Sequence, residues 1–308
     1  MKYAILFPGQ GAQEVGMCAD ARAAFPDLCG APATAVLGWD LDSLISNGPE
    51  EILTETQHAQ PALYAVSYAL WREFSSIVSV DPSAAAGHSL GEYTALAATS
   101  ALGYLDGLGL VARRGEAMAS AARIEESGMA ALLGADLALA QTVVAARTNE
   151  GGNLTIANMN APGQIVVAGD MDDLAWLESN ARDLGVRRAV RLKVAGAFHS
   201  PFMASAAREL ADALETINFS STSVDVYANV SGRPTTDPSG TLLAQLTAPV
   251  RFAETLENIA STGVDTFVHI GPGDVTAGLV KRTVKDADVK VVSSMDQARA
   301  VARELSVD

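Results

Sequence analysis

Apolar residues recur along this chain at two spacings, one typical of buried strands and one typical of helices. The apolar run at residues 3–7 stops at a proline and a glycine, as a buried strand does when it ends in a tight loop. From Asp40 to Phe74 the apolar residues recur at helical spacing. The same reasoning predicts further strands at residues 82–89, 225–232 and 265–273, and further helices at 91–102, 104–122 and 249–261.

The segment from about residue 127 to residue 193 has its own order of elements. Its pattern predicts strands at residues 128–135, on both sides of the turn at 161–163 and at 187–194, with helices at 136–148 and 171–185. The order βαββαβ is the ferredoxin-like pattern, and a complete unit of this kind within a longer α/β chain indicates an insertion. We therefore expect a large subdomain formed by residues 1–125 and 195–308, and a ferredoxin-like subdomain at 126–194.

The composition narrows the class of protein. With 308 residues, 49% of them hydrophobic, the chain can bury a substantial core, and no apolar run reaches the roughly 18 residues of a membrane helix. The N-terminal apolar run is too brief for a signal peptide, while Cys18 and Cys29 are too few for a disulfide framework and lack metal-ligand spacing. We expect a reduced, cytoplasmic setting, a monomer, no membrane association and no metal.

The formal net charge of −15 opposes nucleic acid as a partner, because phosphate binding needs a basic face. A small anionic substrate held by a few local arginines remains compatible with this charge. Basic residues cluster at 113–114, 187–193 and 281–285. Each cluster taken alone is first interpreted as a solvated helix or strand face.

The clearest chemical motif is Gly87-His88-Ser89-Leu90-Gly91, between an expected strand and an expected helix. A Gly-x-Ser-x-Gly match in that context is typical of a nucleophile elbow, in which a strained turn lifts the serine above the sheet. The N–H of Leu90 would then lie at a helix N-terminus, where it can stabilise an oxyanion. The competing interpretation is a small residue in a glycine-rich bend, and the flanking elements favour the nucleophile.

A serine hydroxyl needs a base, and the chain has four histidines. His88 should point away from Ser89 and make a hydrogen bond within the elbow. His58 is interpreted as a polar residue at a helix start, and His269 as a partly buried, hydrogen-bonded residue of a strand. His199 follows a small-residue turn and is the candidate base. No acid stands out at a strand end between Ser89 and His199, so the sequence is consistent with a Ser–His dyad as well as with a triad.

Eight motifs together resemble one known family. They are FPGQGAQ at residues 7–13, TQHAQPAL at 56–63, GHSLGEY at 87–93, RRG at 113–115, NAPGQIVVAG at 160–169, GAFHS at 196–200, PVRF at 249–252 and IGPGDVTAGLVKR at 270–282. In this order they are similar to the malonyl-CoA:acyl carrier protein transacylases and the related acyltransferase domains of polyketide and fatty-acid synthases. The resemblance covers essentially the whole chain. It implies an α/β-hydrolase-like core with a ferredoxin-like insertion.

The resemblance also implies roles for single residues. Ser89 would be the acylated nucleophile and His199 its general base and acid. The backbone N–H groups of Gln10 and Leu90 would form the oxyanion hole.

The remaining implied roles concern the substrate pocket. Arg114 would pair with the free carboxylate of a malonyl group, and Gln60 would line the same pocket. Phe198 would favour malonyl over bulkier branched groups. The carbonyl that orients the histidine would fall at Arg251.

The implied reaction moves a malonyl group from malonyl-CoA to the phosphopantetheine thiol of acyl carrier protein by a ping-pong scheme through Ser89, supplying extender units for fatty-acid synthesis. No cofactor is implied. Acyl carrier protein is acidic in this family, so Lys281 and Arg282, with Arg187 and Arg188, are candidates for its docking patch.

Three other functions compete with this one. A serine hydrolase would share the elbow, but it does not need Arg114 and normally adds a triad acid and a donor motif such as His-Gly-Gly-Gly, which the sequence lacks. A discrete acyltransferase of a polyketide assembly line would share the chemistry. An inactive scaffold for carrier protein would not explain why both dyad positions are filled.

Overall fold

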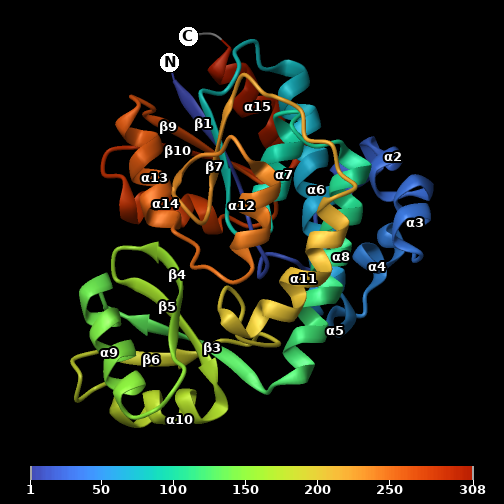
Figure 1. The fold of residues 1–308 in the computed structure, drawn as a ribbon. Helices are drawn as coiled ribbons and strands as arrows, with labels where there is room; N and C mark the ends of the chain where they lie inside the picture. The colour runs from blue at the N-terminus through green and yellow to red at the C-terminus, as the bar shows by residue number, and fades with distance from the viewer. Residues whose placement is uncertain (1, 307–308) are drawn as a thin grey trace.

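A computed structural model describes residues 2–306, which fold around two β-sheets (Figure 1). The larger sheet has the order β10-β9-β1-β2-β7-β8, in which β8 alone is antiparallel to its neighbour. Its strands are β1 (Tyr3–Phe7), β2 (Ala84–Gly87), β7 (Asp225–Ala228), β8 (Arg233–Pro234), β9 (Thr266–Ile270) and β10 (Asp288–Val292). Because β1 is central and every one of its residues is buried, the first predicted strand is confirmed.

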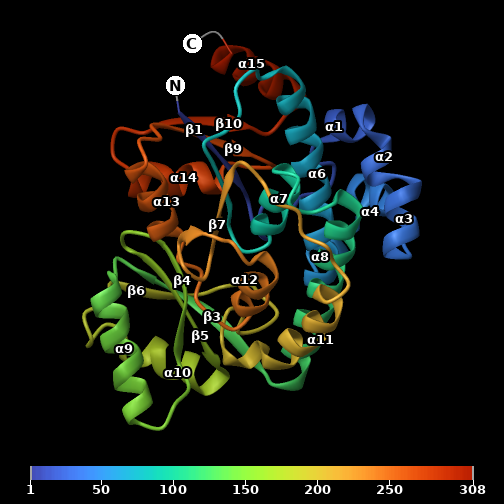
Figure 2. The ribbon, with the colours of Figure 1, turned by 45° about the horizontal axis from the view of Figure 1, so that its top comes forward.

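Alternate residues of β1 enter two different cores, as the period-2 geometry of a strand requires. Tyr3, Ile5 and Phe7 join a core with helices α6 (Thr56–Ile77), α8 (Tyr104–Ile124) and α15 (Met295–Leu305). Ala4 and Leu6 join a second core with α13 (Phe252–Ser261) and α14 (Val275–Thr283). Helices therefore cover both faces of the parallel sheet, as Figure 2 shows.

The smaller sheet has the order β4-β5-β3-β6, with every neighbouring pair antiparallel. Its elements follow the chain as β3 (Ser127–Leu133), α9 (Leu137–Asn149), β4 (Thr155–Ala161), β5 (Gln164–Asp170), α10 (Met171–Asn180) and β6 (Arg188–Arg191). This is the βαββαβ order expected from the sequence. Strand β4 also pairs with the larger unit, because Met159 N donates to the Val250 carbonyl at 2.8 Å. The subdomain boundaries at residues 126 and 194 stay a prediction.

The remaining elements are α1 (Ala19–Ala24), α2 (Pro26–Cys29), α3 (Ala31–Leu37), α4 (Leu41–Asn47), α5 (Glu50–Leu53), α7 (Gly91–Ala98), the 3-10 turn η1 (Pro201–Met203), α11 (Ala204–Leu214) and α12 (Pro238–Gln245). The helical stretch expected at 40–74 is three helices: Gly48 and Pro49 separate α4 from α5, and Thr54 and Glu55 separate α5 from α6. The α/β fold class is confirmed. Within residues 2–306, no helix has the length and apolarity needed to cross a bilayer.

Candidate active site

Ser89 lies on a sharp turn between β2 and α7, with a positive φ of 51°. Two glycines make this turn possible. A Cβ on Gly87 would lie 1.9 Å from the carbonyl carbon of Gly91, and a Cβ on Gly91 would lie 2.3 Å from the carbonyl oxygen of Phe7. The elbow thus packs directly against the end of β1, and no other residue type fits at either glycine. A strained serine at the carboxyl end of a parallel strand is the geometry of a nucleophile elbow.

Asn229, which follows β7, holds the turn in place through both atoms of its buried amide. Its Oδ1 accepts from Ser89 N at 2.7 Å, and its Nδ2 donates to the Gly87 carbonyl at 2.7 Å. The side chain substitutes for the strand hydrogen bonds that the chain gives up at the elbow. It therefore fixes the backbone on both sides of His88.

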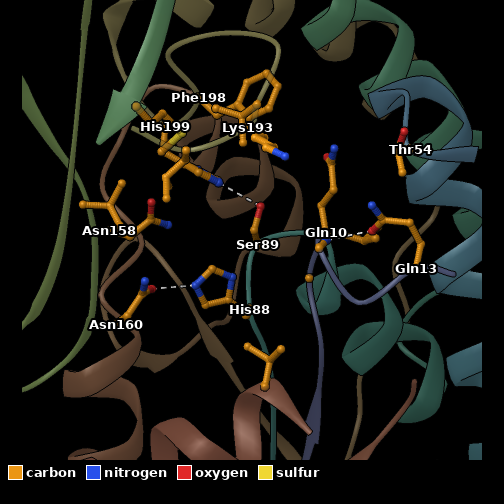
Figure 3. A pocket seen from close by; sticks show the side chains of 18 of the residues that line it. Gln10, Gln13, Thr54, His88, Ser89, Asn158, Asn160, Lys193, Phe198 and His199 are labelled. Carbon is orange, nitrogen blue, oxygen red and sulfur yellow. Dashed lines mark hydrogen bonds between the residues drawn. The ribbon is translucent and has the colours of Figure 1, made fainter. Parts of the chain in front are cut away.

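His199 contacts the hydroxyl of Ser89 through Nε2, at 2.8 Å (Figure 3). Its Nδ1 lies 2.8 Å from the backbone carbonyl of Gln245, which can only accept a hydrogen bond. The proton is therefore on Nδ1, and Nε2 is free to accept the serine proton. The two side chains form a dyad oriented by a carbonyl, with no carboxylate in the third position.

The orienting carbonyl is not that of Arg251, which corrects the sequence expectation. Arg251 precedes α13, so its carbonyl accepts the first hydrogen bond of that helix, from Thr255 N at 2.9 Å. Its side chain donates to Glu254 at 2.7 Å. Arg251 is not among the residues that line the cleft around Ser89.

Arg114 projects from α8 to the dyad and is only 1% exposed. Its Nη2 donates to Ser89 Oγ at 3.0 Å and to Gln245 Oε1 at 2.8 Å, while Nη1 donates to Gln60 Oε1 at 2.7 Å. The face of the guanidinium lies 5.5 Å from the ring centre of Tyr93. Gln60 is fully buried and holds Arg114, but it is not part of the cleft lining.

The surroundings of His199 favour its neutral form. Burial, and then the positive charge of Arg114, lower the pKa of His199 to about 3. Burial also lowers the pKa of Arg114. His199 is therefore a neutral base at physiological pH.

A cleft of about 620 Å³ opens above Ser89 between the two sheets. Gln10 and Leu90 both line it, as do Phe198 and Lys193, which lie beside His199 in Figure 3. Within residues 2–306, no acceptor contacts the N–H of Gln10 or that of Leu90. Two free donors beside a serine can stabilise a developing oxyanion.

The other three histidines are placed away from the reacting atoms. His88 Nε2 donates to Asn160 Oδ1 at 2.7 Å, so its partner is on β4 and not within the elbow as expected. His58 lies in the first turn of α6, 3.1 Å from the Ile52 carbonyl. His269 is hydrogen-bonded to Thr276, as expected, but it is fully buried and not partly so.

The basic residues considered for docking are all exposed. Lys281 and Arg282 form the last turn of α14, whose Val275 and Leu279 line the cleft. Arg282 also donates to Gln164 of β5 at 2.8 Å. Arg188 is the first residue of β6, and Arg187 immediately precedes it. The described part of the chain holds no group of three or more His, Cys, Asp or Glu side chains placed to bind a metal.

Sequence reasoning missed three residues of this site: Asn229, Gln245 and Glu92. Asn229 and Gln245 lie outside the recognised motifs, so only the fold brings them to Ser89. Glu92 stood within the motif GHSLGEY, but its burial beneath the elbow has no signal in the sequence.

Comparisons with known proteins agree with this geometry. A family model described as the acyl transferase domain matches residues 5–303. The malonyl CoA-acyl carrier protein transacylase of Bacillus subtilis is 40% identical over 291 residues, which is 91% of this chain and 90% of the relative.

Solved structures give the same result. The malonyl CoA-acyl carrier protein transacylase of Coxiella burnetii has a TM-score of 0.94 at 31% identity, covering 99% of this chain and 98% of that one. A type II PKS acyl-carrier protein in complex with its malonyl-transacylase supplies a second match, with a TM-score of 0.92, 35% identity and 99% coverage of each chain. The chain therefore belongs to the malonyl CoA-acyl carrier protein transacylase family.

Proposed function

We propose that this protein transfers a malonyl group from malonyl-CoA to the phosphopantetheine thiol of acyl carrier protein, through a malonyl ester on Ser89. The observation that carries the proposal is the buried guanidinium of Arg114, 3.0 Å from Ser89 Oγ. A malonyl group on that oxygen carries a carboxylate separated from its ester carbonyl by one methylene, which places the carboxylate within reach of this cation. An arginine can take such a carboxylate through two parallel hydrogen bonds.

In the first half-reaction Ser89 Oγ attacks the thioester carbonyl of malonyl-CoA while His199 Nε2 takes the hydroxyl proton. The backbone N–H groups of Gln10 and Leu90 stabilise the oxyanion, typically by a few kcal/mol each. The tetrahedral intermediate then collapses, the C–S bond breaks, and the imidazolium returns its proton to the departing CoA thiolate.

In the second half-reaction the thiol of the phosphopantetheine arm enters the cleft. His199 takes the thiol proton, the sulfur attacks the ester carbonyl, and the proton passes to Ser89 Oγ as the C–O bond breaks. No step changes an oxidation state, and every bond that forms or breaks belongs to a substrate, to Ser89 or to His199. We place the reaction in the cytoplasm, in the supply of extender units for fatty-acid synthesis.

Arg114 would reject acyl groups without a carboxylate. Acetyl-CoA would leave a buried cation without its anionic partner, and a polar site discriminates strongly against such a ligand. A simple serine hydrolase has no use for this cation, which favours transfer of a dicarboxylic acyl group over ester hydrolysis.

The test is intact-mass measurement after exposure to malonyl-CoA, followed by addition of holo acyl carrier protein. We expect a malonyl-sized mass increase on the wild type and none on Ser89→Ala, and then transfer of that mass to the carrier protein. Rapid CoA release with no acylated carrier product would identify a hydrolase instead. Addition of malonyl mass to the Ser89→Ala variant would overturn the nucleophile assignment.

A further inference from the structure

Glu92 is a buried carboxylate beneath the elbow that the mechanism above does not use. It lies in the first turn of α7, and its side chain is fully buried. One oxygen, Oε2, accepts from Gln245 Nε2 at 2.7 Å and from Asn229 N at 3.0 Å. The other, Oε1, has no hydrogen-bond partner among the described residues. A buried charge of this kind is costly, so its presence needs an explanation.

Three contacts agree on which way the Gln245 amide points, and Glu92 makes the shortest of them. A carboxylate only accepts hydrogen bonds, so the NH₂ of Gln245 must face Glu92. The same NH₂ donates to the Ser89 carbonyl at 3.1 Å. The amide oxygen is then left facing Arg114, where it accepts from Nη2 at 2.8 Å. The opposite amide orientation would place an NH₂ group against the guanidinium and leave two donors facing one another.

Glu92 therefore acts on Arg114 through one intervening side chain. The hydrogen-bond partners of the guanidinium among the described residues, Gln60, Ser89 and Gln245, are uncharged. Their oxygen atoms accept from Nη1 and Nη2 and so set the direction of these donors. Of the two amides, that of Gln245 bonds the same nitrogen, Nη2, that meets the nucleophile. Its orientation thus controls where the cation lies relative to an acyl group on Ser89.

We propose that Glu92 is a positioning residue for acyl-group selectivity: it fixes the Gln245 amide, and the amide holds Arg114 in the orientation that receives the malonyl carboxylate. This inference rests on the proposed malonyl transfer. It concerns the preference for malonyl over acetyl groups, and not the reactivity of Ser89 itself. The backbone carbonyl of Gln245, which orients His199, belongs to the last residue of α12 and is not the group that Glu92 contacts.

Two conservative variants separate position from charge. Glu92→Asp keeps the charge but withdraws the carboxylate by about one methylene, beyond hydrogen-bond reach of Gln245. Glu92→Gln loses the charge, yet its carbonyl oxygen can replace Oε2 and accept from both partners. We expect Glu92→Asp to lower the ratio of kcat/KM for malonyl-CoA to that for acetyl-CoA at least tenfold, and Glu92→Gln to keep it within about threefold of the wild type.

Glu92 also accepts from Asn229 N, so the labelling rate of Ser89 by an uncharged sulfonyl fluoride is measured in each variant, and the quantity compared is the selectivity ratio, in which a common change in Ser89 reactivity cancels. Thr94→Ala, another buried substitution on α7, is the matched control and should leave the ratio unchanged. Gln245→Leu should lower the ratio as Glu92→Asp does. The double variant should be no worse than Gln245→Leu alone, because both changes act on the same contact.

A reversed order, with Asp retaining selectivity and Gln losing it, would show that charge and not position matters, and would overturn the proposal. A ratio unchanged in both variants, or additive losses in the double variant, would overturn it as well. A wild-type enzyme with no preference for malonyl over acetyl groups would instead contradict the proposed function.

Discussion

The backbone carbonyl of Gln245 lies 2.8 Å from His199 Nδ1, where a serine hydrolase usually holds a carboxylate. A neutral carbonyl orients the ring and selects its tautomer, but it stabilises the imidazolium less than a negative charge does. Arg114 on the other side opposes protonation further. The dyad is thus built around a histidine that stays neutral until the transition state.

This relationship predicts an unusual pH profile. Because burial and Arg114 lower the pKa of His199 to about 3, the base remains unprotonated from pH 8 down to pH 5. The labelling rate of Ser89 by an uncharged sulfonyl fluoride should therefore stay nearly constant across that range. An ordinary histidine, with a pKa near 6.5, would cause a fall of about thirtyfold at pH 5.

Two other buried titratable groups near Ser89, Glu92 and His88, are the alternative sources of a pH-dependent step in this labelling rate. Burial raises the pKa of Glu92 to about 7 and lowers the pKa of His88. A step near pH 7 that disappears in Glu92→Gln would belong to Glu92. A step that persists in that variant and follows a pKa near 6.5 would contradict the prediction for His199.

Arg114 provides the second prediction. Arg114→Ala should lower kcat/KM for malonyl transfer by about 10²–10³, because a charge-assisted bidentate contact is lost, while the relative rate with acetyl-CoA rises. Arg114→Lys should be intermediate, since one ammonium cannot bond Gln60 and Gln245 as the two guanidinium nitrogens do. Steady-state kinetics with both thioesters measure the ratio. Equal losses for both substrates would mean that Arg114 is only structural.

Asn229 provides the third prediction. In Asn229→Asp, an oxygen replaces the amide nitrogen that donates to the Gly87 carbonyl at 2.7 Å, so two acceptors would face each other in a buried place. We expect acylation of Ser89 to fall at least tenfold and the free energy of unfolding to drop by about 1–3 kcal/mol. Asn258→Asp is the matched control, because Asn258 makes the same type of contact with the Gly232 carbonyl and none with the elbow itself. Wild-type acylation in Asn229→Asp would refute the holding role.

The elements of this fold could be predicted where local pattern determines them. The strand at residues 3–7, the helix at 104–122 and the βαββαβ order depend on the spacing of apolar residues, which is present in the sequence. Helices α12, α14 and α15 were not predicted, although α15 has a clear buried face. Gly240 and Gly278 weaken the helical pattern of α12 and α14.

The site could be predicted only in part, for a similar reason. Ser89, His199 and Arg114 stand in recognisable motifs, and the structure brings them together. The carbonyl that orients His199 belongs to the backbone, so no side chain marks it, and the expectation placed it six residues too far along the chain. Asn229 and Gln245 are common amides whose importance depends on which atoms the fold places beside them.

The burial of Glu92 gives a fourth prediction, about stability. Its pKa is raised to about 7 in the folded protein, against about 4.5 for the free group, so the folded state binds the proton more tightly. The contribution of Glu92 to the free energy of unfolding therefore falls as pH rises from about 4.5 to 7. Glu92→Gln removes this loss, so the variant should gain on the order of 3 kcal/mol relative to the wild type between pH 4.5 and pH 8.

Thermal unfolding of both proteins at pH 5 and pH 8 measures this difference, and contributions of the histidines cancel in the comparison. A gap between the two melting temperatures that does not change with pH would contradict the assignment of a raised pKa to Glu92.

The last prediction concerns the carrier protein. The chain carries a net charge of −15, so an acidic partner must be drawn by a local field, and Lys281 and Arg282 extend the helix that borders the cleft. Charge reversal at both residues should raise KM for acyl carrier protein several-fold, more strongly at low salt, and leave acylation by malonyl-CoA unchanged. Lys281→Glu and Arg282→Glu are also measured singly, and Arg303→Glu, an exposed reversal on α15, is the control for the net-charge change of each single variant. If that control raises KM equally, the effect comes from the overall charge and docking lies elsewhere.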